Sequence, residues 1–148
     1  MSRLSLEPSR DPANYVFVHR LRARFAETDA MGIIHHGAYL PYLEEARAAL
    51  LRHVGRPYNG VRSAGTDFSV LEIYVRYRRP LYFDETVDIG VVVGDLTRTT
   101  FQVGYLLQVD GEIRSTAVSV HGAVTPDGKP GRMPAWLAGV IDPATPSR

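Results

Sequence analysis

The segment of residues 24–55 constrains the fold of this chain more than any other part of the sequence. It runs from the end of a predicted strand, through a short loop that carries Asp29, into one long amphipathic helix. After His36 the apolar residues recur three or four positions apart, which is the spacing of a single helical stripe. The members of this stripe are Tyr39, Leu43, Ala46, Leu50 and Val54.

Proline and glycine indicate where this helix begins and ends. Proline breaks a helix interior but is tolerated in a first turn, so Pro41 predicts a start within residues 37–40. Gly55 is expected to end the helix. At such a start, free backbone N–H groups and the positive end of the helix dipole point outward, beside the Asp29 loop. This arrangement favours the binding of negative charge.

Outside the helix, most of the chain alternates between apolar and polar residues, which is typical of strands with one buried face. Five strands are predicted, at residues 15–25, 71–78, 87–93, 101–109 and 113–124. The last of them is apolar or small on both faces, as expected for a central strand. The links between the later strands are too short for parallel crossovers, so the sheet is antiparallel. The predicted fold class is α+β, with a curved five-stranded antiparallel sheet wrapped around one long central helix.

With 148 residues, the chain is long enough for one domain with a hydrophobic core. We expect a flexible N-terminal arm over residues 1–14, a single domain over residues 15–141 and a C-terminal tail over residues 142–148. Residues 55–66 are rich in glycine and are expected to form an irregular loop, and a short helix is expected near residues 135–141.

Composition excludes several classes of function. A net charge of +1 gives no reason to expect nucleic acid or a membrane surface as a partner. The absence of cysteine excludes disulfides, thiolate catalysis and cysteine-ligated zinc. No signal peptide and no apolar run of about 18 residues is present, so we expect a cytoplasmic protein. The pair His35 and His36 lacks further ligands at suitable spacing, so neither a metal nor a cofactor is expected.

The order of elements, the loop ETDAMGIIHHGAY and the helix segment LEEAR resemble the hotdog-fold acyl-CoA thioesterases. The nearest branch is the 4-hydroxybenzoyl-CoA thioesterase type, and the resemblance covers about residues 15–125. Its motif is an Asp, a Gly three positions on, a His or Tyr at seven, an aromatic residue at ten and an acidic residue at fifteen. Here these residues are Asp29, Gly32, His36, Tyr39 and Glu44.

The resemblance implies the activity and the site. In that family the Asp is the catalytic carboxylate, the backbone N–H at the position of His36 helps to polarise the thioester carbonyl, and acyl-CoA lies between two subunits. We therefore expect Asp29 to act as nucleophile or general base, in a homodimer or homotetramer. The residues expected to line the substrate site are Gly32, His35, Gly37, Tyr39 and Glu44.

The chemistry of thioester hydrolysis agrees with this reading. The carbonyl oxygen becomes anionic in the transition state, and a free N–H at a helix start is a fixed donor for it. Without cysteine, a carboxylate is the natural base or nucleophile.

Other readings of the same residues remain open. Asp29 also suits a turn or a helix cap. Glu44 also suits a solvated or subunit-contact residue paired with Arg47. The coenzyme phosphates require cations, for which two arginine groups are equally eligible, namely Arg20, Arg22 and Arg24, or Arg76, Arg78 and Arg79.

Alternative functions on the same fold are an acyl-carrier-protein or polyketide thioesterase, and a non-catalytic acyl-CoA-binding module. A hydratase is disfavoured, because the related hydratases pair an Asp with a His five positions later, where Ile34 stands here.

Overall fold

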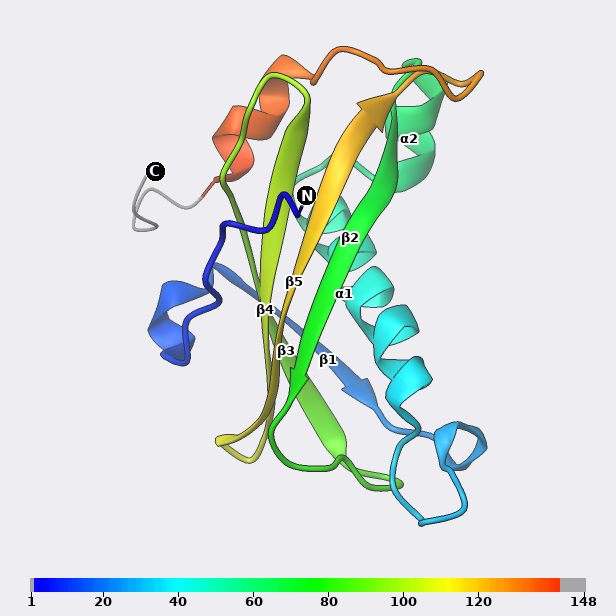
Figure 1. Ribbon diagram of the computed structural model, residues 1–148, viewed down its shortest axis with the longest axis vertical. Helices are drawn as coiled ribbons and strands as arrows, with labels where there is room; N and C mark the ends of the chain where they lie inside the picture. Colours follow the sequence, from blue (N-terminus) through cyan, green and yellow to red (C-terminus); the bar gives the residue numbers. More distant parts are fainter. Residues whose placement is uncertain (1, 142–148) are drawn as a thin grey trace.

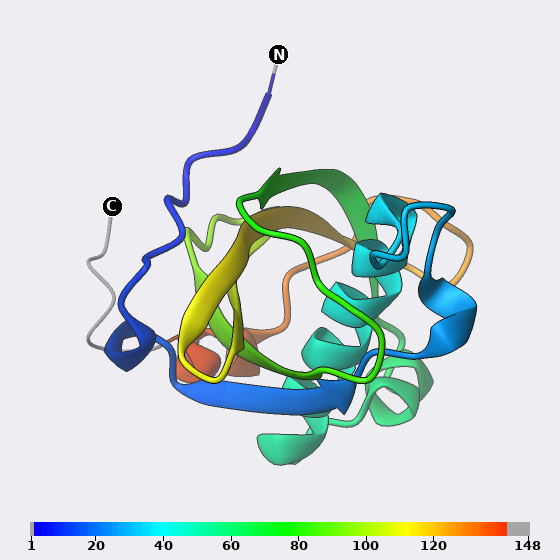
Figure 2. The same cartoon turned by 90° about the horizontal axis from the view of Figure 1, so that it is seen from below.

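Helix α1 (Tyr39–His53) lies in the hollow of a five-stranded antiparallel sheet in the computed structural model, which describes residues 2–141 (Figure 1). Seen from below, the strands curve around the helix (Figure 2). The predicted α+β architecture, a curved antiparallel sheet around one long helix, is confirmed. None of the helices within residues 2–141 is long and apolar enough to cross a membrane.

Both ends of α1 follow the sequence signals. Pro41 is the third residue of the helix, and a turn of 3-10 helix, η3 (His36–Ala38), leads into it. At the other end, Gly55 has a φ of +77° and its N–H donates to the carbonyl of Arg52. Glycine adopts positive φ without steric cost, so Gly55 ends the helix as predicted.

The five strands are β1 (Phe17–Arg22), β2 (Asp67–Tyr77), β3 (Thr86–Gly94), β4 (Thr100–Val109) and β5 (Glu112–Val124). Their order in the sheet is β1-β3-β4-β5-β2, and every pair is antiparallel. The connection through α1 thus carries the chain from one edge of the sheet to the other. As a result, β2 is an edge strand, and within residues 2–141 no other strand pairs with its outer edge.

Strand β1 is shorter than the predicted range of residues 15–25. Its side chains alternate between half-buried and exposed, as predicted. At one end, Tyr15 packs against Gly90, where a Cβ atom would lie 2.9 Å from its ring. At the other end, Phe25 starts a 3-10 turn, η2 (Phe25–Glu27), in which the side chain of Glu27 accepts the N–H of Arg24.

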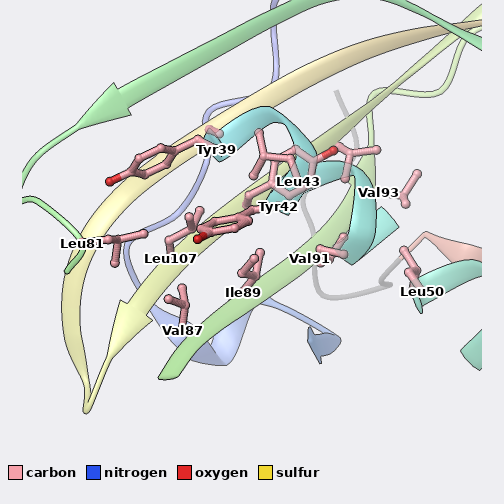
Figure 3. Close-up of a cluster of buried hydrophobic side chains, with 14 of the residues drawn as sticks. Tyr39, Tyr42, Leu43, Leu50, Leu81, Val87, Ile89, Val91, Val93 and Leu107 are labelled. Atoms are coloured by element: carbon pink, nitrogen blue, oxygen red, sulfur yellow. The ribbon is translucent and has the colours of Figure 1, made fainter. Parts of the chain in front are cut away.

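The core lies between α1 and the concave face of the sheet (Figure 3). Tyr42, Leu43 and Leu50 of α1 face side chains of β3 and β4. The β3 residues in this layer are Val87, Ile89, Val91 and Val93, which alternate along the strand and are all buried. Fully burying a large aliphatic side chain contributes about 1.5–3 kcal/mol to stability. This layer therefore fixes where the start of α1 sits relative to the sheet.

The N-terminal segment covers part of the convex face. The N–H groups of Ser5 and Leu6 both donate to the side-chain oxygen of Gln102 at 3.0 Å, and Leu6 is buried. Ser5 and Leu6 make these specific contacts within the segment of residues 1–14 for which the sequence predicts a flexible arm. Leu4, Leu6 and Val118 of β5 line the same hollow on this face. The prediction of a central strand covered on both faces is confirmed, because β5 lies between β4 and β2 and consecutive residues along most of it are buried.

Two further elements pack at the end of α1. The predicted irregular loop of residues 55–66 instead contains a short helix, α2 (Tyr58–Ser63), which follows Pro57 and buries Val61. The predicted helix near residues 135–141 is a 3-10 helix, η4 (Ala135–Val140), that buries Leu137. The predicted C-terminal tail, residues 142–148, lies outside the described residues.

Candidate active site

The carboxylate of Asp29 is built into the loop between β1 and α1. Its Oδ1 atom accepts the N–H of Met31 at 2.8 Å and the N–H of Ile33 at 3.4 Å. Gly32 has a φ of +79°, and its N–H donates to the carbonyl of Asp29. Asp29 thus stabilises its own turn, which is the structural role that aspartate also suits at this position. Its second oxygen, Oδ2, forms no hydrogen bond within residues 2–141, so this atom remains available to a ligand.

Two histidines arrange the backbone at the start of η3. The N–H of Gly37 donates to Nδ1 of His35 at 2.9 Å, and the rings of His35 and His36 stack with centroids 4.1 Å apart. No acceptor within residues 2–141 takes the N–H of His36. The His36 N–H is therefore a free donor at the point where the helical backbone begins.

The last residue of β2 holds this backbone in place. The hydroxyl of Tyr77 donates to the carbonyl of His36 at 3.0 Å. The Tyr77 ring also packs edge-to-face against Tyr39, with centroids 4.8 Å apart. A residue distant in the sequence thus positions the segment that carries the free N–H. In the sequence, Tyr77 is distinguished only as one member of the alternating pattern of a strand.

A groove of about 380 Å³ connects these groups. Asp29, His36 and Tyr39 line it on the side of the loop and helix, and Tyr77, Arg78 and Pro80 line it on the side of β2. A carboxylate and a free N–H at a helix start thus border the same space. This is the pair of groups that acyl transfer to water requires.

The groove wall formed by residues 78–80 is anchored by Arg114 of β5. The carbonyl of Arg114 accepts the N–H groups of Arg78 and Arg79, and its guanidinium donates to the carbonyl of Pro80 at 2.7 Å. The guanidinium also donates to both carboxylate oxygens of Glu85, each at 2.8 Å. These hydrogen bonds from Arg114 hold the pKa of Glu85 below its usual value.

Most of the predicted site residues lie at this groove or in the backbone beside it. Asp29, His36 and Tyr39 line the groove. Gly32 shapes the Asp29 loop, and His35 and Gly37 form the cap that leaves the His36 N–H free.

Glu44 lies elsewhere, at a separate cavity between α1 and the sheet. Its predicted ion pair with Arg47 is not formed within residues 2–141. Arg47 instead turns inward and donates to the hydroxyl of Tyr105 at 3.1 Å. In one chain, Glu44 therefore does not join the groove of Asp29.

The arginines differ in whether a carboxylate already neutralises them. Ion pairs join Arg20 to Asp88, Arg22 to Asp84, Arg24 to Glu27 and Arg79 to Glu112. Arg76 and Arg78 form no ion pair within residues 2–141, and Arg78 lines the groove. Arg76 lines a neighbouring hollow together with the N-terminal segment, so of these two arginines only Arg78 borders the groove. Across the same described residues, no group of three His, Asp or Glu side chains lies close enough to hold a metal ion.

Comparisons with known proteins agree with this geometry. Residues 23–141 match the family described as the thioesterase-like superfamily. The structure of the hypothetical protein AQ1494 from Aquifex aeolicus superposes with a TM-score of 0.80 and 34% identity, covering 85% of this chain and 99% of that one. An esterase candidate from Aquifex aeolicus is 40% identical over 91 residues, which is 62% of this chain and 71% of the relative. YneP of Bacillus subtilis, named as a candidate acyl-CoA thioesterase, is 32% identical over 108 residues, 72% of this chain and 78% of YneP.

The fold, the groove and the family match define an enzyme of the thioesterase class. The chain belongs to the thioesterase-like superfamily, and the resemblance to hotdog-fold thioesterases drawn from the sequence is confirmed.

Proposed function

We propose that this protein hydrolyses acyl-CoA thioesters to a free carboxylic acid and coenzyme A, with Asp29 as its catalytic carboxylate. The observation that supports this assignment is the shared groove of the Asp29 carboxylate and the unpaired N–H of His36. The name of the similar protein YneP points to the same substrate class.

The proposed mechanism uses the backbone N–H of His36 and the carboxylate of Asp29. The N–H of His36 donates to the thioester oxygen as it becomes anionic, an interaction worth roughly 10²–10³ in rate. Oδ2 of Asp29 either takes a proton from the attacking water or attacks the carbonyl itself. In the second case an anhydride forms and coenzyme A leaves as the thiolate. Water then hydrolyses the anhydride, and the proton released in that step converts the thiolate to the thiol. Hydrogen bonds from Met31 and Ile33 to Oδ1 hold the carboxylate during either route.

The coenzyme is proposed to lie along the β2 side of the groove. Arg76 and Arg78 have no carboxylate partner within residues 2–141, whereas the arginines of β1 are already paired. A guanidinium without a carboxylate partner retains its donors for phosphate oxygens. This difference favours Arg78, which lines the groove, as a phosphate ligand, with Arg76 beside it on the same strand as a second candidate.

We further propose that two copies pair through β2. An exposed strand edge of this length tends to pair with another strand. Tyr74 and Tyr77 of β2 are 54% and 49% exposed, which leaves apolar surface on this strand uncovered in one chain. A two-fold axis through this edge joins two sheets into one and brings the two copies together beside their grooves. Sedimentation of a stable, fully active monomer would contradict the shared site.

Release of free thiol measures the proposed activity directly. The panel contains aromatic, short-chain, medium-chain and long-chain acyl-CoAs, together with acyl-carrier-protein thioesters. We expect turnover of at least one acyl-CoA. Turnover of the carrier-protein thioesters alone would favour the acyl-carrier-protein alternative, and binding without turnover would favour a non-catalytic acyl-CoA-binding module.

The matched variant for this assay is Asp29→Asn. An amide oxygen retains the Oδ1 acceptor for the loop N–H groups but cannot accept a proton or attack a carbonyl. We expect kcat to fall roughly 10²–10⁴-fold with little change in substrate affinity. A well-folded Asp29→Asn enzyme that keeps most of its activity would overturn the proposed mechanism.

A further inference from the structure

A second cavity of about 290 Å³ lies between the C-terminal half of α1 and the sheet. Its walls are mainly apolar, with Leu50 of α1, Phe68 of β2, Phe101 and Val103 of β4 and Leu137 of η4 among them. None of the residues that line it lines the groove of Asp29. The cavity is therefore a separate feature of the chain.

A chain of buried polar groups reaches this cavity. Arg47 donates to the hydroxyl of Tyr105, which lies 2.7 Å from the hydroxyl of Ser119, and that hydroxyl lies 2.7 Å from Nε2 of His121. Tyr105, Ser119 and His121 are each at most 2% exposed, and His121 borders the cavity. Burial first, and then the charge of Arg47, lowers the pKa of His121 to about 3, so its imidazole is neutral at neutral pH.

Arg47 is the one cationic side chain among the described residues that line the cavity when His121 is neutral. It is half-buried, and no carboxylate within residues 2–141 pairs with it. Its hydrogen bond to Tyr105 uses one of its five N–H donors. A half-buried guanidinium beside an apolar cavity offers its other donors to an anion, and a planar carboxylate fits them in the bidentate geometry.

We propose that this cavity binds an apolar carboxylic acid, whose hydrocarbon body fills the space between α1 and the sheet and whose carboxylate pairs with Arg47. The size of the cavity limits the ligand. At about 30 Å³ for each water-sized group, 290 Å³ holds roughly ten non-hydrogen atoms. Octanoate and phenylacetate have this size and represent the aliphatic and the aromatic source of the same chemistry.

Glu44 opposes the proposed ion pair between the ligand carboxylate and Arg47. It also lines the cavity, and its negative charge opposes a bound carboxylate. Glu44 is exposed whereas Arg47 is half-buried, so water screens the charge of Glu44 more strongly. Attraction to Arg47 therefore prevails, and neutralising Glu44 is expected to strengthen the binding of the acid.

The single tryptophan of the chain provides a reporter. Trp136 packs against Phe68, a cavity residue, with ring centroids 6.3 Å apart. Octanoate and phenylacetate are titrated against the purified protein at pH 7 while Trp136 fluorescence is recorded, with calorimetry as an independent measure. Octanol and phenylacetamide, which lack the charge, are the matched neutral ligands. We expect at least one acid to bind saturably and about tenfold more tightly than its neutral analogue.

Two variants test the role of Arg47. Arg47→Met retains most of the side-chain volume, and we expect it to weaken the acid by about 10–100-fold while the neutral analogue changes less than about twofold. Glu44→Gln leaves Arg47 intact and is expected to tighten the acid a few-fold, which keeps the test decisive if Arg47→Met folds poorly. Equal binding of acid and neutral analogue to the unmodified protein, or no effect of Glu44→Gln on the acid, would overturn the proposal.

Asp29→Asn separates this site from the proposed hydrolysis. Binding at Arg47 does not require the Asp29 carboxylate, so the acid should bind Asp29→Asn as it binds the unmodified protein. Altered acid binding in Asp29→Asn with unchanged binding in Arg47→Met would place the acid in the groove of Asp29 and refute the second site. A failure of hydrolysis in the thiol assay would leave these binding results unaffected.

Discussion

The hydroxyl of Tyr77 and the backbone carbonyl of His36 are joined by a hydrogen bond of 3.0 Å, which ties the end of β2 to the start of η3. Residue His36 carries both the carbonyl that Tyr77 holds and the N–H proposed to polarise the substrate. A strand at the edge of the sheet thus determines the position of a backbone donor that lies 41 residues earlier in the chain.

Removing the Tyr77 hydroxyl should therefore weaken catalysis more than stability. Tyr77→Phe retains the ring contact with Tyr39 but loses one neutral hydrogen bond, worth about 0.5–1.5 kcal/mol. We expect kcat to fall by roughly 2–10-fold while the melting temperature changes little. Steady-state kinetics beside a thermal melt check this expectation, and an unchanged kcat would show that the contact has no part in positioning His36.

Substitutions at His36 distinguish its backbone from its side chain. His36→Ala keeps the N–H, so we expect activity within about tenfold of the unmodified enzyme. His36→Pro removes the N–H and should lose about 10²–10³ in kcat. Proline fits this position, because His35 has the extended backbone (φ −60°, ψ 139°) favoured before proline and a helix start tolerates it.

The two His36 variants must first be shown to fold alike by circular dichroism. If His36→Ala is then as inactive as His36→Pro, the imidazole takes part in the chemistry and the amide assignment fails.

Isotope labelling separates the two roles proposed for Asp29. In a single turnover in ¹⁸O-water, a nucleophilic Asp29 places the label in its own carboxylate once water attacks the anhydride at the protein carbonyl. A general base sends the label only to the acid product. Mass spectrometry of the peptide that contains Asp29 reads the result, with Asp29→Asn as the unlabelled control.

The Glu85–Arg114 pair should make stability depend on pH. Because the folded pKa of Glu85 lies below its ordinary value of 4.5, the ionised carboxylate stabilises the fold above that value. This contribution is lost as the pH falls through the lower, folded pKa. We expect Glu85→Gln to be less stable than the unmodified protein by about 1–2 kcal/mol at pH 7, with the gap closing as the pH falls below 4.5. Urea denaturation at several pH values measures the gap, and a constant gap would contradict the linkage.

The sequence by itself determined the elements that depend on local spacing. The apolar stripe, Pro41 and Gly55 fixed α1, because helix periodicity and backbone restrictions act within a few residues. Short links fixed the antiparallel arrangement of the later strands. The motif around Asp29 and His36 also lies within a short stretch, so its loop and helix start were predictable.

Only the tertiary structure decided which side chains meet across the sheet. Arg47 lies four residues after Leu43 and three before Leu50, so it sits at the border of the buried stripe. Spacing alone leaves such a residue free to pair with Glu44 or to turn inward, and the buried Tyr105 hydroxyl decides the outcome. Tyr77 reaches His36 only because α1 carries the chain to the far edge of the sheet and β2 runs back along it. Contacts of this kind depend on how distant segments pack, and hydrophobic periodicity specifies a buried face without specifying its partner.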